Sequence, residues 1–221
     1  MTVTRPVAFF DFDGTLTRRD SLMPFLHMVR GTSLFALDLV AASPWLAAYA
    51  VRAMRNDRAK EALLGQVLGG KNIDELRKYG EQFANRHISS MLRSQTLTRL
   101  RAHQEQGHCC VLISASLDVY LEPWARSIGF DYCLASSLAT DENGNVTGKF
   151  LGANCFGEEK VKRIQVLLNG IGSPLRTYAY GDSGGDIPML NFVDEGYQVK
   201  KLFGFYRNII PWCSANHRRA C

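Results

Sequence analysis

The sequence predicts an α/β fold in which helices cover both faces of a parallel sheet. Three short apolar runs each have the composition of a buried strand, and each ends in small polar or acidic residues. Helical patterns lie between these runs, and alternating strands and helices are typical of parallel sheets. The runs are residues 7–10, 111–113 and 177–180. Because ligands bind beyond the carboxyl ends of such strands, we expect the three polar segments to meet in one crevice.

The composition is that of an ordinary globular protein. Of 221 residues, 46% are hydrophobic and 21% are charged, which excludes disorder as a global description. The length favours one core domain with a smaller insert. The 26 basic and 21 acidic residues give a net charge of +5. The basic residues are scattered and have no aromatic interleaving, so no nucleic-acid partner is expected, whereas attraction to an anionic substrate or membrane surface stays open.

The cysteines and the N-terminal segment bear on the cellular compartment. None of the six cysteines has metal-site spacing, and adjacent Cys109 and Cys110 point to opposite faces of any strand that holds them. Buried free thiols in a reducing cytosol are the favoured interpretation. The first apolar run is short and leads directly into two carboxylates, unlike a secretory signal. We therefore expect a cytoplasmic protein.

A helical block interrupts the alternation of strands and helices. Strand signals disappear from about residue 20 to residue 92. We interpret 19–92 as an inserted all-helical cap, with 1–18 and 93–221 forming the core. Within 135–150, a turn cluster between two short strand patterns predicts a hairpin.

The stretch 34–51 is nearly free of charge, with Asp38 as its one ionised side chain and Pro44 in its middle. Its length is at the lower edge of the roughly 20 residues that span a bilayer. One interpretation is a buried helix pair broken at Pro44. The other is a segment that dips into a membrane surface. The flanking basic residues are Arg30, Arg52, Arg55 and Arg58. Asp38 and Pro44 both weaken a spanning helix, which favours the first interpretation.

The strongest chemical signal follows the first apolar run. Asp11 and Asp13 are two apart at a strand end, so their side chains can share one side of the chain. Asp11 can attack phosphorus as a nucleophile, and Asp13 can protonate the leaving oxygen and then activate water. Gly14 lets the backbone approach a phosphate, to which the amides of Thr15 and Leu16 can donate. An ordinary Asp-Gly turn is the alternative.

The segment after the third run carries two further carboxylates. Asp182 and Asp186 are four apart, and a helix that begins near Ser183 would turn both toward one crevice. Carboxylate oxygens suit Mg²⁺, which keeps several waters and coordinates phosphate directly. We expect Asp11 and Asp182 to be direct ligands, with Asp186 ligating the metal or orienting a ligand water. A helix N-cap would account for Asp182 alone.

Two other residues complete the candidate site. Ser114 ends the second run and can hydrogen-bond a phosphate oxygen, although a turn or N-cap serine is the alternative. Lys160 shares the inward stripe of a predicted helix with Ile164 and Leu167. It is therefore the candidate cation for the transferring phosphoryl group, with a solvated surface lysine as the alternative.

These motifs, in this order, resemble the haloacid dehalogenase (HAD) superfamily. The segments that carry the resemblance are DFDGTLT at 11–17, VLISAS at 111–116, EEK at 158–160 and GDSGGD at 181–186. The resemblance implies a Rossmann-like three-layer core with an inserted cap, and a Mg²⁺-dependent phosphatase that forms an aspartyl-phosphate on Asp11, with Asp13 as acid and base. It assigns the phosphoryl group to Gly14, Thr15, Ser114, Ala115 and Lys160, and the metal to Asp11, Asp13, Asp182 and Asp186.

The helical insert is similar to the cap of the phosphoserine phosphatase-like branch, subfamily IB. Asp20 stands where those enzymes usually carry a glutamate that grips the amino acid, Ala115 and Ser116 replace two glycines, and Gly185 replaces an asparagine. The substrate therefore stays open among small phosphorylated molecules. Because 34–51 is similar to bacterial enzymes that dephosphorylate phosphatidylglycerophosphate, a phospholipid head group with peripheral membrane contact is one alternative. A non-catalytic HAD-fold binding module is the other.

Overall fold

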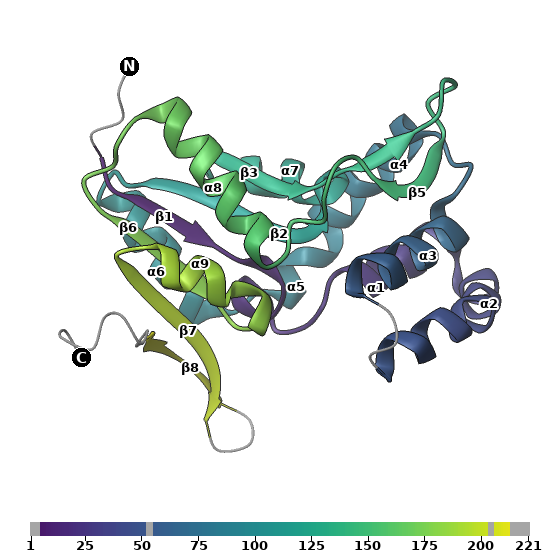
Figure 1. Cartoon of the computed structure of the whole chain (residues 1–221), viewed down its shortest axis with the longest axis horizontal. Coiled ribbons are helices and arrows are strands. Elements are labelled where there is room, and N and C mark those ends of the chain that lie inside the picture. The colour runs from purple at the N-terminus through teal and green to yellow at the C-terminus, as the bar shows by residue number, and fades with distance from the viewer. Residues whose placement is uncertain (1–4, 52–54, 203–205, 213–221) are drawn as a thin grey trace.

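The structure, a computed structural model, describes residues 5–51, 55–202 and 206–212. A six-stranded sheet with the strand order β3-β2-β1-β6-β7-β8 forms the centre (Figure 1). All neighbouring strands run parallel except β7 and β8, which confirms the predicted fold class. The strands are β1 (Val7–Phe10), β2 (Cys109–Leu117), β3 (Tyr132–Ser136), β6 (Thr177–Gly181), β7 (Glu195–Leu202) and β8 (Tyr206–Pro211).

Strand β1 lies in the middle of the sheet and pairs with both β2 and β6. All four of its side chains are fully buried, because alternate residues enter different cores. Ala8 and Phe10 belong to one apolar cluster, and Val7 and Phe9 belong to the other. Because β1 runs parallel to both neighbours, the carboxyl ends of β1, β2 and β6 meet at one edge of the sheet, as expected from the three apolar runs.

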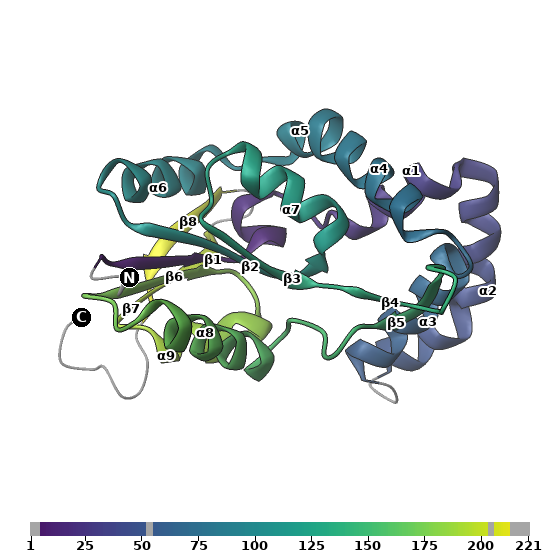
Figure 2. The same ribbon diagram turned by 90° about the horizontal axis from the view of Figure 1, so that it is seen from above.

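Helices cover both faces of this sheet (Figure 2). Helices α6 (Ser94–Glu105) and α7 (Asp118–Ser127) lie on one face, whereas α8 (Glu158–Ile171) and α9 (Ile187–Phe192) lie on the other. Cys109 and Cys110 enter opposite clusters, which confirms the prediction for this pair. The described cysteines are free thiols, and Cys213 and Cys221 lie outside the described residues.

The helical block between β1 and β2 contains α1 (Leu22–Arg30), α2 (Thr32–Ala50), α3 (Asn56–Leu68), α4 (Ile73–Phe83) and α5 (Ser89–Met91). Helices α1, α2 and α3 lie at one end of the molecule, whereas α5 lies nearer the central sheet (Figures 1 and 2). The chain enters and leaves it side by side, since the Arg18 amide donates to the Met91 carbonyl and the Arg93 amide donates to the Leu16 carbonyl, each at 2.8 Å.

The predicted hairpin is confirmed as β4 (Leu138–Thr140) and β5 (Val146–Phe150). It lies against α3, where the Phe150 amide donates to Glu61 Oε1 at 3.1 Å. The hairpin thus touches the helical block although it follows β3 in sequence. The division of the chain at residues 18 and 92 stays a prediction.

Helix α2 differs from the favoured interpretation of 34–51. It runs unbroken through Pro44. Pro44 has no N–H to donate to the Val40 carbonyl, and this carbonyl accepts from Ser43 Oγ at 2.7 Å. Asp38 is turned inward, where it accepts from Arg30 Nε at 2.5 Å and from Gln66. The predicted buried helix pair is therefore wrong: α2 is one helix with an exposed apolar face. The helices of the described residues are nevertheless too short or too polar to cross a bilayer.

Candidate active site

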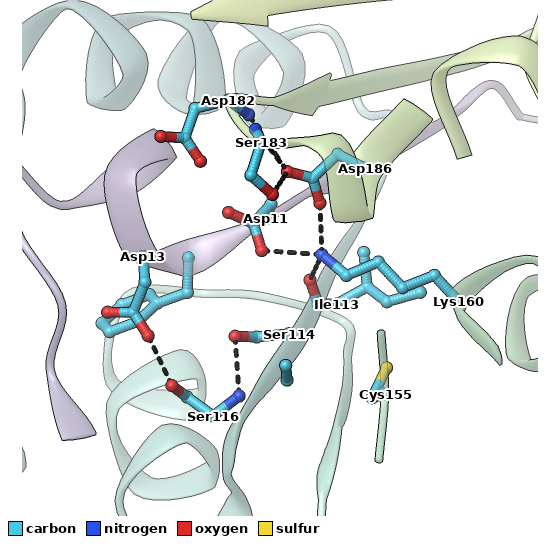
Figure 3. A network of polar contacts seen from close by, with 12 residues as sticks. Asp11, Asp13, Ile113, Ser114, Ser116, Cys155, Lys160, Asp182, Ser183 and Asp186 are labelled. Atoms are coloured by element: carbon cyan, nitrogen blue, oxygen red, sulfur yellow. Dashed lines mark hydrogen bonds and ion pairs between the residues drawn. The ribbon is translucent and has the colours of Figure 1, made fainter. Parts of the chain in front are cut away.

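The side chain of Lys160 contacts residues at the end of β1, in β2 and in the turn after β6 (Figure 3). Its ammonium donates to Asp11 Oδ1 at 2.7 Å, to Asp186 Oδ1 at 2.6 Å and to the Ile113 carbonyl at 3.1 Å. All three N–H groups are thus engaged, and the side chain is 2% exposed. A buried ammonium is stable only when it is paired in this way, so the alternative of a solvated surface lysine is wrong.

Three carboxylates lie close together at this edge of the sheet, and two of them, Asp11 and Asp186, pair with the ammonium. Asp11, Asp182 and Asp186 each offer one oxygen, and these oxygens lie within 4.8 Å of one another. Asp11 follows β1 directly and continues the sheet, since its amide donates to the Tyr180 carbonyl at 2.9 Å. One ammonium among three carboxylates leaves an excess of negative charge, and hard oxygen donors are what Mg²⁺ prefers. The donor set therefore fits a divalent cation.

Asp186 also holds the turn that follows β6. Its Oδ2 accepts from the amides of Asp182 and Ser183 at 3.1 and 3.0 Å, and from Ser183 Oγ at 2.9 Å. Because Oδ1 accepts from Lys160, both oxygens of Asp186 have protein partners. The two roles expected for Asp186 are direct ligation of the metal and orientation of a ligand water. This geometry favours the second.

The pKa values of these carboxylates reflect their burial and their shared cation. Burial and the neighbouring Asp186 carboxylate raise the pKa of Asp11 to about 8, although Lys160 opposes this shift. Burial also acts to raise the pKa of Asp186, but the charge and hydrogen bond of Lys160 hold it below its ordinary value. A bound divalent cation would favour the ionised form of each.

Asp13 lies apart from the three gathered carboxylates (Figure 3). Its Oδ1 accepts from the Ser21 amide at 2.8 Å, and its Oδ2 accepts from the Ser116 hydroxyl. The structure therefore does not bring the Asp13 carboxylate to the other predicted metal residues. Burial, with a further contribution from Asp20, raises the pKa of Asp13 to about 6. A carboxyl group with such a pKa suits a general acid that later acts as a base.

Gly14 allows this turn to approach the metal residues. Its φ of +84° lies in the left-handed region, and a Cβ there would occupy the space of the Asp182 carboxylate. Its amide donates to Thr17 Oγ1 at 3.2 Å. Thr15, predicted to face phosphate, is fully buried, and its carbonyl accepts from Thr96.

The predicted phosphate residues on β2 lie beside this site. The register between β2 and β3 shifts between Ile113 and Leu117, which separates Ser114 and Ala115 from the regular ladder. Ser114 is buried, and its Oγ accepts from the Ser116 amide at 3.1 Å, as in the turn alternative. The Ala115 carbonyl accepts from Lys60 of α3 at 2.6 Å.

A cavity of about 320 Å³ connects these groups with the helical block. Its walls come from the polar segments of the sheet and from α1 and α3. The lining residues are Asp11, Asp13, Asp20, Leu22, Ala59, Lys60, Leu63, Ser114, Ala115, Ser116, Phe156, Lys160, Ser183 and Asp186. Sequence reasoning missed Lys60, although the signal was present: Lys60, Leu63, Leu64 and Val67 recur at helical spacing, as Lys160 does with its neighbours.

Comparisons with known proteins find relatives that span most of this chain. The family description "haloacid dehalogenase-like hydrolase" matches residues 8–191. The protein CicA of Caulobacter vibrioides is 33% identical over 192 residues, covering 86% of this chain and 84% of its own. A probable phosphatase of Mycobacterium tuberculosis is 26% identical and covers 86% and 67%, respectively. A histidinol-phosphatase of Neisseria meningitidis is 26% identical over 57% of this chain and 59% of its own.

Solved structures share the fold. A protein of unknown function from Bordetella pertussis superposes with a TM-score of 0.71 at 26% identity, covering 88% of this chain and 89% of that one. A substrate-bound phosphoserine phosphatase superposes with a TM-score of 0.63 at 16% identity, covering 88% and 85%. At that identity, the second likeness concerns the fold alone.

Proposed function

Because the chain belongs to the haloacid dehalogenase-like hydrolase family, we propose that it is a Mg²⁺-dependent phosphatase that forms an aspartyl-phosphate on Asp11. The observation that carries this proposal is the convergence of the Asp11, Asp182 and Asp186 carboxylates, of which Asp11 and Asp186 pair with the buried ammonium of Lys160. The names of two relatives, a probable phosphatase and a histidinol-phosphatase, support it. A small phosphorylated molecule is the proposed substrate, because the cavity is compact.

Each residue has a distinct part in the proposed reaction. Asp11 Oδ1 accepts from Lys160, so Oδ2 is the oxygen that attacks phosphorus. The bond from phosphorus to the alcohol oxygen breaks, and Asp13 gives its proton to that oxygen. Asp13 then takes a proton from water, whose oxygen attacks phosphorus, releases phosphate and restores Asp11. Ser114, the backbone of Ala115 and the Gly14–Thr15 turn are proposed to hold the phosphoryl oxygens.

The metal would be held by Asp11 and Asp182, with Asp186 orienting them. A bound Mg²⁺ ion would neutralise negative charge on the phosphoryl oxygens. Lys160 favours the ionised form of Asp11 against the effect of burial and orients its carboxylate within the buried cluster. The Asp13 carboxylate serves proton transfer in this proposal and is not required as a ligand.

Hydrolysis of p-nitrophenyl phosphate tests the proposal. We expect turnover with Mg²⁺, loss with EDTA, and a fall of about 10³-fold or more in Asp11→Asn. Asp74→Asn is the control, because that carboxylate is exposed on α4 and should leave activity unchanged. Equal turnover by wild type and Asp11→Asn would contradict the assigned nucleophile. No turnover of any phosphomonoester would favour the non-catalytic binding module.

Residues 19–92 are proposed to form the cap, with 1–18 and 93–221 as the core. The two segments by which the chain enters and leaves the cap are paired near Arg18 and Arg93, which supports an insertion at one point of the core. The cavity between the sheet edge and α3 supports a role of this cap in substrate choice. The hairpin lies against α3 through the contact of Phe150 with Glu61, and none of its residues lines the cavity.

A lipid phosphate is the second candidate substrate. One observation favours it: α2 exposes Leu37 and Val40, which are 65% and 72% exposed, and its single charge is turned inward. Val51, directly after the helix, is 74% exposed. Arg55 and Arg58 are exposed near the end of this helix, and Arg52 lies outside the described residues. An apolar helix face with basic residues at its end suits an anionic membrane surface.

Co-sedimentation with vesicles tests this second candidate. We expect binding to vesicles that contain phosphatidylglycerol, weaker binding to pure phosphatidylcholine, and loss of binding in Leu37→Glu/Val40→Glu. Val166→Glu is the matched control, because Val166 is equally exposed on α8, far from α2. Equal recovery in the supernatant with and without anionic vesicles would rule out membrane docking, and the small-molecule substrate would stand.

A further inference from the structure

We propose that Lys60 forms an anion-binding subsite for a second negative charge on the alcohol portion of the substrate. The inference rests on the proposed phosphatase function, and it specifies which phosphomonoesters the cavity selects. It starts from one juxtaposition: the ammonium of Lys60, on α3, reaches the Ala115 carbonyl beside the predicted phosphate residues.

Lys60 is the cation of this cavity that retains hydrogen-bonding capacity. Among the described residues, two lysines line the cavity, and the three donors of Lys160 are all engaged. Lys60 donates to the Ala115 carbonyl at 2.6 Å, and it takes part in none of the ion pairs found within the described ranges. An ammonium carries three donors, so two remain for a ligand.

The charge of Lys60 also lacks direct compensation. Burial lowers its pKa, while the carboxylates of Asp13 and Asp20 act in the opposite direction without forming an ion pair with it. Both oxygens of Asp13 already accept from Ser21 and Ser116. The Phe150 ring lies 5.8 Å from the ammonium and adds a weak attraction. A mostly buried cation in this state is stabilised when an anion binds beside it.

The position of Asp13 indicates which part of the substrate meets Lys60. Asp13 is the proposed proton donor to the leaving oxygen, so the alcohol portion must extend past it. The wall on that side consists of Asp20 and Leu22 near α1, and of Ala59, Lys60 and Leu63 on α3. Apolar side chains form much of this wall, and Lys60 is the cation among these five residues. A compact alcohol with a single carboxylate or phosphate group matches this wall, and Asp20 offers an acceptor to a hydroxyl group.

A matched pair of ligands tests the subsite. Glycerol 3-phosphate and 3-phosphoglycerate differ in one terminal group, which is a neutral hydroxymethyl in the first and a carboxylate in the second. We would measure their dissociation constants by calorimetry with Mg²⁺, using Asp11→Asn to prevent turnover, and their kcat/KM values with the active enzyme. We expect about tenfold tighter binding of 3-phosphoglycerate, because its carboxylate accepts one charge-assisted hydrogen bond from Lys60 that the hydroxymethyl group does not.

Variants at position 60 separate recognition from loop positioning. Lys60→Gln should abolish the preference while changing glycerol 3-phosphate binding less than twofold, and Lys60→Arg should retain it. Lys162→Gln, an exposed lysine on α8, should behave as the parent protein. Thermal unfolding of each variant checks that the fold is retained.

Several outcomes would overturn the subsite. Equal losses for both ligands in Lys60→Gln would mean that Lys60 only holds the Ala115 segment. The subsite is equally refuted if the parent protein shows no preference or binds neither ligand. By contrast, a Lys60-dependent preference in binding, combined with no hydrolysis of any phosphomonoester, would refute the phosphatase function and leave the subsite standing.

Discussion

A Cβ atom on Gly14 would lie 2.1 Å from Oδ2 of Asp182, far inside contact distance. Gly14→Ala should therefore displace a proposed metal ligand and strain a backbone with positive φ. We expect the Mg²⁺ concentration for half-maximal activity to rise at least tenfold, with a loss of roughly 1 kcal/mol in the free energy of unfolding. The measurement is a Mg²⁺ titration of p-nitrophenyl phosphate hydrolysis.

Gly152→Ala is the matched control for that substitution. Gly152 has a φ of +81°, yet a Cβ there would meet nothing within 4 Å. Gly152→Ala should therefore show the loss of stability caused by positive φ, without a change in the Mg²⁺ concentration for half-maximal activity. Indistinguishable Mg²⁺ titrations of the two variants would mean that crowding against Asp182 does not matter.

Lys160→Met removes the cation shared by Asp11 and Asp186. Breaking a buried ion pair in this way costs about 3–5 kcal/mol. The loss of Lys160 also raises the pKa values of both carboxylates, so stability should be lost as the pH rises, and the defect should be larger at pH 8 than at pH 6. Urea unfolding in EDTA measures this defect, and added Mg²⁺ should reduce it.

Lys162→Met, on the exposed side of the same helix, is the control for helix propensity. Its free energy of unfolding should stay within about 0.5 kcal/mol of wild type. A Lys160→Met defect that is independent of pH would argue against uncompensated carboxylates as its cause.

Protonation of His103 should make the free energy of unfolding depend on pH. Its Nδ1 lies 2.7 Å from Nδ1 of His108, and its Nε2 lies 2.9 Å from the hydroxyl of Tyr180. Burial, followed by His108 and Arg99, lowers the pKa of His103 from 6.5 to about 4. The pKa of His103 is lower in the folded state than in the unfolded state. The neutral ring therefore contributes to the free energy of unfolding in full above pH 6.5, and this contribution is lost as the pH falls toward 4.

Between pH 7.5 and 5, wild type should therefore lose about 2 kcal/mol more than His103→Gln. Carboxylate titrations are common to both proteins and cancel in this difference. Urea midpoints across that range provide the measurement, and His87→Gln, whose ring is exposed, provides the control. Parallel stability curves for wild type and His103→Gln would refute the assignment.

Asp38→Ala should destabilise the helical block. Asp38 of α2 is buried and accepts from Arg30 of α1 and Gln66 of α3, so it links three helices. We expect a loss of about 1–2 kcal/mol in the free energy of unfolding. Asp74→Ala breaks an exposed ion pair with Arg77 and should cost under about 0.5 kcal/mol. Equal costs would mean that the buried link contributes nothing beyond a surface pair.

The parts of the site that follow from local pattern could be predicted from the sequence. Asp11, Asp182 and Asp186 each follow a buried strand closely, and the sheet rule places such ends together. Lys160 could be predicted because helical periodicity marks its buried face. These signals require no knowledge of how distant segments pack.

Other features depend on packing or on local detail that pattern does not encode. Lys60 enters the cavity only because α3 packs over the Ala115 segment. Helix α2 continues through Pro44, and the Ser43 hydroxyl donates to the Val40 carbonyl that the proline leaves without an N–H donor. The Asp13 carboxylate lies apart from those of Asp11, Asp182 and Asp186. A tight turn, with Gly14 at positive φ, follows β1 and ends the alternation of side chains that the strand pattern would predict.

The central place of β1 makes the proposed nucleophile depend on segments that are distant in sequence. Asp11 follows β1 directly, whereas its neighbour β6 and the turn beyond it come from residues 177–186. A chain cut before Thr177 would leave the apolar strand Val7–Phe10 with one of its two pairing partners missing. It would also lack the carboxylates of Asp182 and Asp186, so we expect that such a truncated chain cannot assemble the proposed metal site.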